Sequence, residues 1–177
     1  MNHADHVALL AGGVTQGEGG TWADLGAGTG AFTLALADLI GAHGVIHAID
    51  RDRSALAELR SAFVSAVPHA ELRVRASDFT RRLELSDLDG VVMANSLHFV
   101  EDKLPVLALV RGYLKHVGRL VLVEYDSDRG NTWVPHPMTF ETWSAIATDA
   151  GFLDTRRLAT VPSRFLRRIY SALSLAP

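Results

Sequence analysis

The sequence predicts an α/β fold, a three-layer sandwich in which helices cover both faces of a mostly parallel, seven-stranded sheet. Two observations predict it. First, apolar segments of strand length alternate with amphipathic segments of helix length over most of the chain. Second, only Pro162, Ser163 and Arg164 separate the last two strand-like segments. Because this connection is too short for a parallel crossover, these two strands should form a C-terminal antiparallel hairpin.

A short amphipathic segment and several glycines come before the first strand. Residues 3–11 can form a short helix, and the glycines between residues 12 and 20 make a flexible lead-in. The sequence contains no linker, internal repeat or low-complexity stretch. We therefore expect residues 1–177 to form one domain, in which residues 1–20 are a short N-terminal helix and a glycine-rich lead-in.

Seven segments have the composition of strands. Residues 90–95 are almost continuously apolar, as a parallel strand covered on both faces should be. Residues 72–77 alternate apolar and polar side chains, which is typical of an outer strand. The strands are expected at residues 22–25, 45–50, 72–77, 90–95, 119–125, 155–161 and 165–175.

Four longer segments have the period of amphipathic helices. They are expected at residues 31–40, between Ser54 and Pro68, at residues 103–116, and between Thr139 and Gly151. Ser54 and Thr139 are candidate N-caps, because a hydroxyl can accept from the first free N–H groups of a helix. The residues expected to share one face of the second helix are Leu56, Leu59, Phe63, Val64 and Val67. The charged residues 81–88 should form a surface helix or a loop.

The composition excludes several classes of site. The net charge is −3, so no global positive field attracts nucleic acid or an anionic membrane surface. The absence of cysteine excludes disulfides, a cysteine nucleophile and thiolate metal sites. His3 and His6 have metal-like spacing but lie near a terminus, so we expect no metal site. The chain opens without a basic segment or an apolar run of membrane-spanning length, which predicts a cytoplasmic enzyme with no membrane partner.

The segment from Thr21 to Thr33 is expected to form a strand, a glycine-dense turn and the start of a helix. Glycines in such a turn let the backbone approach a ligand closely, and the helix start presents unpaired N–H groups. The spacing Gly26-x-Gly28-x-x-Ala31, with Asp50 downstream, satisfies a dinucleotide fingerprint. Asp24 argues against it, because a carboxylate beside a pyrophosphate would be repelled. An acid there suits a ligand that carries an ammonium group and no phosphate.

The run Asp24-Leu-Gly-Ala-Gly-Thr-Gly30 resembles the first motif of the class I S-adenosylmethionine (SAM)-dependent methyltransferases, written [DE]-x-G-x-G-x-G. The resemblance implies a Rossmann-like fold with strand order 3-2-1-4-5-7-6 and an antiparallel seventh strand. It implies methyl transfer from SAM, with S-adenosylhomocysteine as product, to a small-molecule acceptor. Two alternatives remain at this point: an NAD(P)-binding oxidoreductase, and a SAM-binding protein without transfer activity. The oligomeric state is left open.

The resemblance also implies where each part of SAM would lie. Asp24 would bind the ammonium group, and Asp50, after the second strand, would bind the ribose hydroxyls. The N–H groups of the glycine turn would bind the carboxylate, through Gly26, Ala27, Gly28 and Gly30. Adenine would lie near Asp78 and Phe79, and beside Arg51, where the family usually has an apolar residue. Asn95, after the fourth strand, is a further expected contact. Each acid has a structural alternative, as the cap of a turn or the partner of a backbone N–H.

Candidate acceptor residues follow the fourth and fifth strands. His98 is expected to act as a general base or to bind the acceptor by a hydrogen bond, because imidazole titrates near neutral pH. A structural hydrogen bond to a backbone carbonyl is the alternative. Tyr125 and Trp133 could line the acceptor pocket, although such a Trp can simply anchor a loop. The Asn/Asp-Pro-Pro-Tyr/Phe signature of amino-methylating DNA and protein enzymes is absent after the fourth strand, so a nucleic-acid substrate is not expected.

Overall fold

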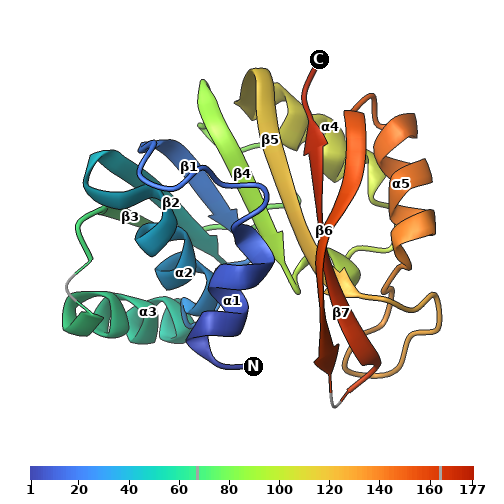
Figure 1. The fold of residues 1–177 in the computed structure, drawn as a ribbon, viewed down its shortest axis with the longest axis horizontal. Helices are drawn as coiled ribbons and strands as arrows, with labels where there is room; N and C mark the ends of the chain where they lie inside the picture. Colours follow the sequence, from blue (N-terminus) through green and yellow to red (C-terminus); the bar gives the residue numbers. More distant parts are fainter. Residues whose placement is uncertain (67, 164) are drawn as a thin grey trace.

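The computed structural model describes residues 1–66, 68–163 and 165–177, which are arranged as helices around one seven-stranded sheet (Figure 1). The strands are β1 (Gly20–Leu25), β2 (Gly44–Asp50), β3 (Glu71–Ala76), β4 (Leu88–Ala94), β5 (Leu114–Tyr125), β6 (Leu153–Ser163) and β7 (Arg167–Leu175). The helices are α1 (His3–Leu10), α2 (Ala31–Ile40), α3 (Arg53–Ala66), α4 (Leu104–Tyr113) and α5 (Phe140–Asp149). Short 3-10 turns lie at Gly41–His43 and Leu97–Phe99.

The order of the strands in the sheet is β3-β2-β1-β4-β5-β7-β6, which confirms the predicted topology. The first five strands run parallel to one another, and β7 lies antiparallel between β5 and β6. Chain order reverses between β1 and β4, because β2 and β3 lie on one side of β1 while β4 and β5 lie on the other. This position is the switch point at which open parallel sheets bind their ligands, beyond the carboxyl ends of the strands.

Helices cover both faces of the sheet, as the three-layer prediction requires. Side chains of α1 and α2 pack with one face of β1, β4, β5 and β7 in one buried cluster, and α3 packs on β2 and β3 on the same face. Side chains of α4 and α5 pack with the opposite face in a second cluster. Trp143 of α5 and Tyr170 of β7 are both fully buried there. No helix among the described residues has the length and apolarity needed to cross a membrane.

The start of α3 differs from the prediction. The helix begins at Arg53, so Ser54 lies inside its first turn. The cap is Asp52, whose Oδ1 accepts from the backbone N–H groups of Ser54 at 2.8 Å and Ala55 at 3.2 Å. A carboxylate also interacts favourably with the positive end of the helix dipole. The prediction that Ser54 caps α3 was therefore wrong by two positions.

The buried face of α3 is narrower than the sequence pattern indicated. Leu56, Leu59 and Phe63 are buried, whereas Val64 is 77% exposed. Val64 was therefore wrongly included in the buried face, because α3 lies on an outer part of the sheet and has no second layer to cover it. Val67, the last residue expected on that face, lies outside the described residues, as does Arg164 of the expected hairpin turn.

The helix expected at residues 103–116 ends at Tyr113, and the chain enters β5 at Leu114. Contacts between distant segments cause the early end. Lys115 Nζ lies 2.7 Å from Asp89 Oδ1, and the Val117 N–H donates to the Ala176 carbonyl at 3.2 Å. Pairing with β4 and the C-terminal segment therefore overrides the local helix preference.

Residues 81–87, just before β4, form a loop that is fixed to the core. The Leu83 side chain is buried, and the Leu83 N–H donates to the Tyr113 hydroxyl at 2.8 Å. The loop alternative of the prediction is therefore the correct one. Two further predictions agree with the structure: α2 has the expected bounds, and Thr139 caps α5 by accepting from the Thr142 N–H. The turn of the C-terminal hairpin was predicted too early, because Pro162 and Ser163 still pair within β6 and β7 begins only at Arg167.

One close approach in the core leads to a prediction about stability. A Cβ atom at Gly90 of β4 would overlap the ring of Trp22, a side chain only 2% exposed. Gly90→Ala should therefore lower the free energy of unfolding by about 1–3 kcal/mol, the usual cost of overpacking a core. Gly112→Ala in α4 is the matched control, because no heavy atom lies within 4 Å of its Cβ position. Urea unfolding of both variants measures the effect, and equal stability would contradict it.

Candidate active site

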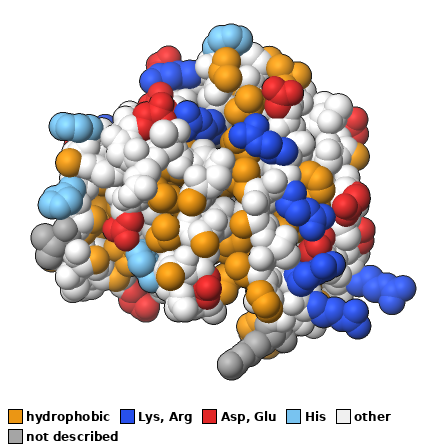
Figure 2. All heavy atoms as spheres, viewed as in Figure 1, with side chains coloured by type: hydrophobic (Ala, Val, Ile, Leu, Met, Phe, Trp, Pro, Cys, Tyr) orange, Lys and Arg blue, Asp and Glu red, His pale blue; other side chains and the backbone are white. Residues whose placement is uncertain are grey.

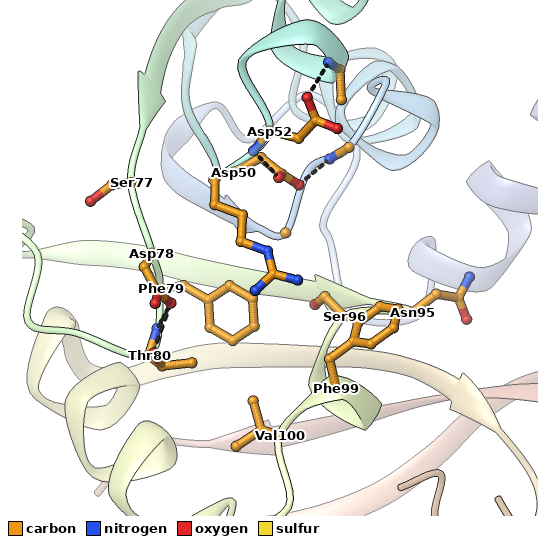
Figure 3. A pocket seen from close by; sticks show the side chains of 14 residues that line it. Asp50, Asp52, Ser77, Asp78, Phe79, Thr80, Asn95, Ser96, Phe99 and Val100 are labelled. Carbon is orange, nitrogen blue, oxygen red and sulfur yellow. Dashed lines mark hydrogen bonds between the residues drawn. The ribbon is translucent and has the colours of Figure 1, made fainter. Parts of the chain in front are cut away.

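A cavity of about 500 Å³ opens at the carboxyl ends of β1 to β4, at the switch point of the sheet (Figure 3). Seven of the residues predicted to bind the cofactor line it: Gly26, Gly28, Asp50, Arg51, Asp78, Phe79 and Asn95. Asp24, Ala27 and Gly30 belong to the same segment as Gly26 and Gly28 but do not line the cavity. The strand ends therefore bring together residues that are up to 69 positions apart in the chain, from Gly26 to Asn95.

The three glycines of the turn after β1 are needed for two different reasons. A Cβ at Gly26 would overlap the Cβ of Ser96, and a Cβ at Gly30 would lie 2.7 Å from Leu59 Cγ. Those two positions therefore let the turn pack against β4 and α3. At Gly28 the φ angle is +52° and no heavy atom lies within 4 Å of the Cβ position. Since Gly28 lines the cavity, a side chain there would project into space that a ligand can use.

Most N–H groups of this turn already donate within the protein. Those of Gly26 and Ala27 donate to the Ile49 carbonyl at 2.8 and 3.1 Å, and that of Gly30 to the Ala27 carbonyl at 3.0 Å. The Gly28 N–H donates to Asp50 Oδ2 at 2.8 Å. Among the described residues, only the Thr29 N–H of this turn has no such partner. The free donors that could bind a carboxylate are therefore this group and the first N–H groups of α2.

Asp50 at the end of β2 joins two parts of the site. Its Oδ2 accepts from the Gly28 N–H, and its Oδ1 accepts from the Asp52 N–H at 2.8 Å. Asp52 in turn caps α3. The carboxylate thus fixes the glycine turn relative to the start of α3, and it still faces the cavity (Figure 3). Each carboxylate oxygen has a second lone pair, so these bonds leave acceptor capacity for a ligand hydroxyl.

The residues after β3 form a second wall of the cavity. Asp78 Oδ1 accepts from the N–H of Thr80 at 2.9 Å and from its hydroxyl at 2.8 Å. These two bonds hold the pKa of Asp78 below its usual value, with smaller effects from the charges of Arg81 and Arg51. Asp78 is therefore an ionised acceptor at the cavity wall. The ring of Phe79 lies beside the Gly26 turn, 3.4 Å from the Cβ position of that residue.

Two buried oxygen atoms near the cavity lack a hydrogen-bond donor. Asp24 is 1% exposed, and its Oδ2 accepts from the Thr33 hydroxyl at 2.6 Å. Asp24 Oδ1 has no hydrogen-bond partner, and neither does Asn95 Oδ1. These residues lie at the carboxyl ends of β1 and β4, which are neighbours in the sheet. Burial raises the pKa of Asp24 to about 6, with a smaller effect from the charge of Asp50. Such unpaired acceptors fit a ligand that brings its own donors.

Beyond the ends of β4 and β5, His98 and Glu124 form a buried pair. His98 lies on the 3-10 turn after β4, Glu124 lies near the end of β5, and their side chains are 3% and 0% exposed. His98 Nδ1 is 3.0 Å from both carboxylate oxygens of Glu124. The carbonyl of His98 accepts from the His136 N–H at 3.0 Å, which joins the loop before α5 to this turn. The expected alternative role of the ring, donation to a backbone carbonyl, is not what the structure shows.

The other predicted acceptor residues lie at different depths. The ring of Tyr125 is 5.9 Å from that of His98, and burial raises its pKa, with a further contribution from Glu124. Trp133 is 76% exposed on the loop between β5 and α5 and does not line the cavity. Phe99, which the sequence reasoning passed over, lines the cavity with a 59% exposed ring, 4.3 Å from the ring of His98.

Several lining residues were missed because their side chains have no diagnostic chemistry. Nearly all of them follow the ends of β2, β3 or β4 within a few positions, and that location is the signal that could have found them. They are Asp52, Ala55, Ser77, Thr80, Ser96, Phe99 and Val100. Ala55 is the exception, because it comes from the first turn of α3.

A glycine turn after β1, acids after β2 and β3, and a sheet reversed between β1 and β4 define the class of α/β proteins that bind an adenosine cofactor at the switch point. A model of the family described as a methyltransferase domain matches residues 23–120. This match covers more than half of the 177 residues, so the chain belongs to that family and is a class I SAM-dependent methyltransferase. SAM is its methyl donor, and the oxidoreductase alternative is set aside.

Solved structures with the same fold include three that span most of this chain. A SAM-dependent methyltransferase from Aquifex aeolicus is 20% identical, with a TM-score of 0.72 over 93% of this chain and 85% of its own. The YcgJ protein from Bacillus subtilis is 11% identical, with a TM-score of 0.77 over 98% of each chain. An arsenic(III) SAM methyltransferase from Chlamydomonas reinhardtii is 19% identical, with a TM-score of 0.73 over 93% of this chain.

This chain spans only 64% of the Chlamydomonas protein. No curated protein sequence matches it. At 11–20% identity, the three structures show that the fold is shared. They leave the acceptor undetermined.

Asp24 should make stability depend on pH. Its folded-state pKa, about 6, lies above the unfolded value of 3.8. The free energy of unfolding should therefore fall as the pH rises from about 4 to about 6, because the carboxyl group ionises more readily in the unfolded chain. Asp24→Asn cannot ionise, so it should gain stability relative to the wild type from pH 4 to pH 6 and then level off. A shift of about two pKa units corresponds to a relative gain of about 3 kcal/mol.

Urea unfolding at pH 4, 5, 6, 7 and 8 measures this difference. An unpaired amide group in the Asn variant would add an offset that does not change with pH, so the slope is the decisive quantity. A difference that stays constant over this range would contradict the buried, ionisable Asp24.

Proposed function

We propose that this methyltransferase acts on a small-molecule acceptor that enters the cavity on its Phe99 side. The observation that carries the proposal is the cavity itself: about 500 Å³, with the cofactor residues on one side and Phe99 and Val100 on the other. This volume is in the range of small-molecule sites. The ring of His98, which does not itself line the cavity, lies 4.3 Å from the ring of Phe99 and is paired with Glu124, so chemistry for handling a proton is present next to the acceptor side.

The residues on the cofactor side fit the groups that SAM displays. Asp24 Oδ1 and Asn95 Oδ1 are buried acceptors without donors, which suits the ammonium group of the methionine part. Asn95 lines the cavity, whereas Asp24 does not and would bind the ammonium group through a bridging water. Asp50 retains lone pairs for the ribose hydroxyls, and Asp78 is an ionised acceptor placed for the amine of adenine. The Thr29 N–H and the start of α2 are left for the carboxylate. Arg51 lines the cavity, where its planar head can stack on the adenine ring.

Bound SAM supplies a methyl group on a sulfonium, which an acceptor takes by in-line displacement without protonation of the leaving thioether. The protein contributes mainly position, because holding two reactants in line can supply a large part of the rate enhancement. Phe99 and Val100 present apolar surface against which an acceptor can pack. His98 can accept a proton from an acceptor that arrives protonated. Tyr125 and Trp133 do not line the cavity and remain candidate contacts of an acceptor.

The surface supports a small acceptor and not a nucleic acid. In Figure 2, Lys and Arg side chains gather mainly toward the β6–β7 side of the face shown, and acidic side chains lie among them. With a net charge of −3, the chain lacks the strong positive field that polyanion binding requires. The arsenic(III) acceptor named for the Chlamydomonas protein is not carried over. A soft arsenic(III) centre favours thiolate ligands, and this sequence has no cysteine.

The function can be tested by following the methyl group. We expect SAM and S-adenosylhomocysteine to raise the melting temperature and NAD and NADP to leave it unchanged, because a ligand stabilises the state that binds it. Tritium from methyl-labelled SAM should then appear in one class within a panel of phenols, alkyl amines and thiols. Stabilisation by S-adenosylhomocysteine, without transfer to any acceptor, would instead favour a SAM-binding protein without activity.

The Asp50 assignment gives a quantitative prediction. Asp50→Ala should weaken S-adenosylhomocysteine binding by about 1.5–3 kcal/mol, the value of a hydrogen bond to a charged group. This corresponds to roughly 10- to 150-fold in the dissociation constant. Titration calorimetry measures it, with Asp149→Ala on the exposed end of α5 as control. Unchanged affinity in a folded Asp50→Ala protein would remove the ribose assignment.

A further inference from the structure

The His98–Glu124 pair is built from two neighbouring strands of the sheet. Ala94 of β4 pairs with Val123 of β5, so the residues that follow these positions meet at the same edge. Both oxygens of Glu124 lie 3.0 Å from His98 Nδ1. The Oε1 atom also accepts from the Tyr125 N–H at 2.7 Å. The carboxylate is therefore held by its own backbone and directed at one nitrogen of the ring.

The pair is expensive to bury, which argues against a role in packing alone. Glu124 is 0% exposed, and an apolar side chain of similar size would avoid the cost of removing a carboxylate from water. Lys103 lies close enough to compensate part of this charge. Burial lowers the pKa of Lys103, and Glu124 is the largest of the nearby acidic charges that raise it. The Lys103 ammonium group donates to the Val100 carbonyl at 2.8 Å, beside the cavity.

The geometry determines which ring nitrogen of His98 carries the proton. An ionised carboxylate can only accept hydrogen bonds, so the nitrogen that faces both of its oxygens must be a donor. In the neutral ring, Nδ1 then holds the hydrogen and Nε2 holds the lone pair. Nε2 makes no hydrogen bond to the described residues. His98 is 3% exposed and does not itself line the cavity, but its ring lies 4.3 Å from that of Phe99, which does. Nε2 is therefore the ring nitrogen whose lone pair no described residue occupies.

We propose that Glu124 is a positioning residue that fixes His98 as the Nδ1–H tautomer, so that Nε2 accepts the proton of the methyl acceptor. The proposal rests on the proposed function, in which His98 serves the acceptor. The proton of the acceptor passes to Nε2, and the lone pair of the acceptor atom bonds to the methyl carbon. The electron pair of the broken carbon–sulfur bond stays on sulfur. The resulting imidazolium is stabilised by Glu124 and later returns its proton to water.

Glu124→Gln tests this directly, because it keeps the shape of the side chain and replaces one acceptor oxygen with a donor NH₂ group. The Tyr125 N–H needs an acceptor at the position of Oε1, so the amide oxygen of the new side chain should occupy it. The amide NH₂ then faces His98 Nδ1, which must become the acceptor. The variant should therefore hold His98 as the opposite tautomer, with the proton on Nε2.

The readout is the ¹⁵N chemical shifts of the His98 ring at a pH where the ring is neutral, assigned by comparison with His98→Gln. We expect the Nδ1–H tautomer in the wild type and the Nε2–H tautomer in Glu124→Gln. The surface control Glu58→Gln should leave the wild-type spectrum unchanged. An Nε2–H tautomer in the wild type, or the same tautomer in both proteins, would overturn the proposal.

Calorimetry with S-adenosylhomocysteine separates this proposal from the proposed function. The wild type and Glu124→Gln should bind it with affinities within about twofold, because Glu124 does not line the cavity. Failure of the wild type to bind would remove the proposed function, while the ring spectra would still decide which nitrogen carries the proton. A large loss of binding in the variant alone would show that Glu124 supports the whole site, and would contradict a role confined to His98.

Discussion

Burial of carboxylates at one edge of the sheet is the constraint on which the rest of the site depends. Asp24, Asp50 and Glu124 lie at the carboxyl ends of β1, β2 and β5, and two of the three are at most 1% exposed. Removing an ionised carboxylate from water costs several kcal/mol unless donors replace the water. The fold supplies those donors to a different extent at each position, and the differences correspond to different tasks.

At Asp50 the backbone provides both donors, from Gly28 and Asp52, so this carboxylate holds the glycine turn in place before any ligand arrives. At Glu124 the donors are the Tyr125 N–H and the His98 ring, so this carboxylate orients the imidazole of His98. At Asp24 one oxygen has Thr33 and the other has nothing. Positions that lower stability without local compensation are typical of binding sites, where the ligand completes the set of partners.

The sequence predicts well those features that depend on residues close together in the chain. The alternation of strands and helices, the bounds of α2 and the Thr139 cap depend on local patterns. Contacts between distant segments could not be predicted. The end of α4 depends on Asp89 and on residue 176, and the pairing of His98 with Glu124 joins residues 26 positions apart. In the glycine turn, the pattern indicated the correct backbone but not that Ile49 and Asp50 occupy its N–H groups.

The cofactor side and the acceptor side of the cavity also differ in how far the family match covers their residues. The family match ends at residue 120, so it includes every predicted cofactor residue from Asp24 to Asn95 and also His98. It ends before Glu124, Tyr125 and the loop that carries Trp133. All family members bind the same donor, so a short motif is enough to identify it. Acceptors differ between members, and here the acceptor side depends on one buried pair whose second residue lies beyond the matched region. The identity of the acceptor must therefore be sought in the chemistry of that pair and of the Phe99 surface.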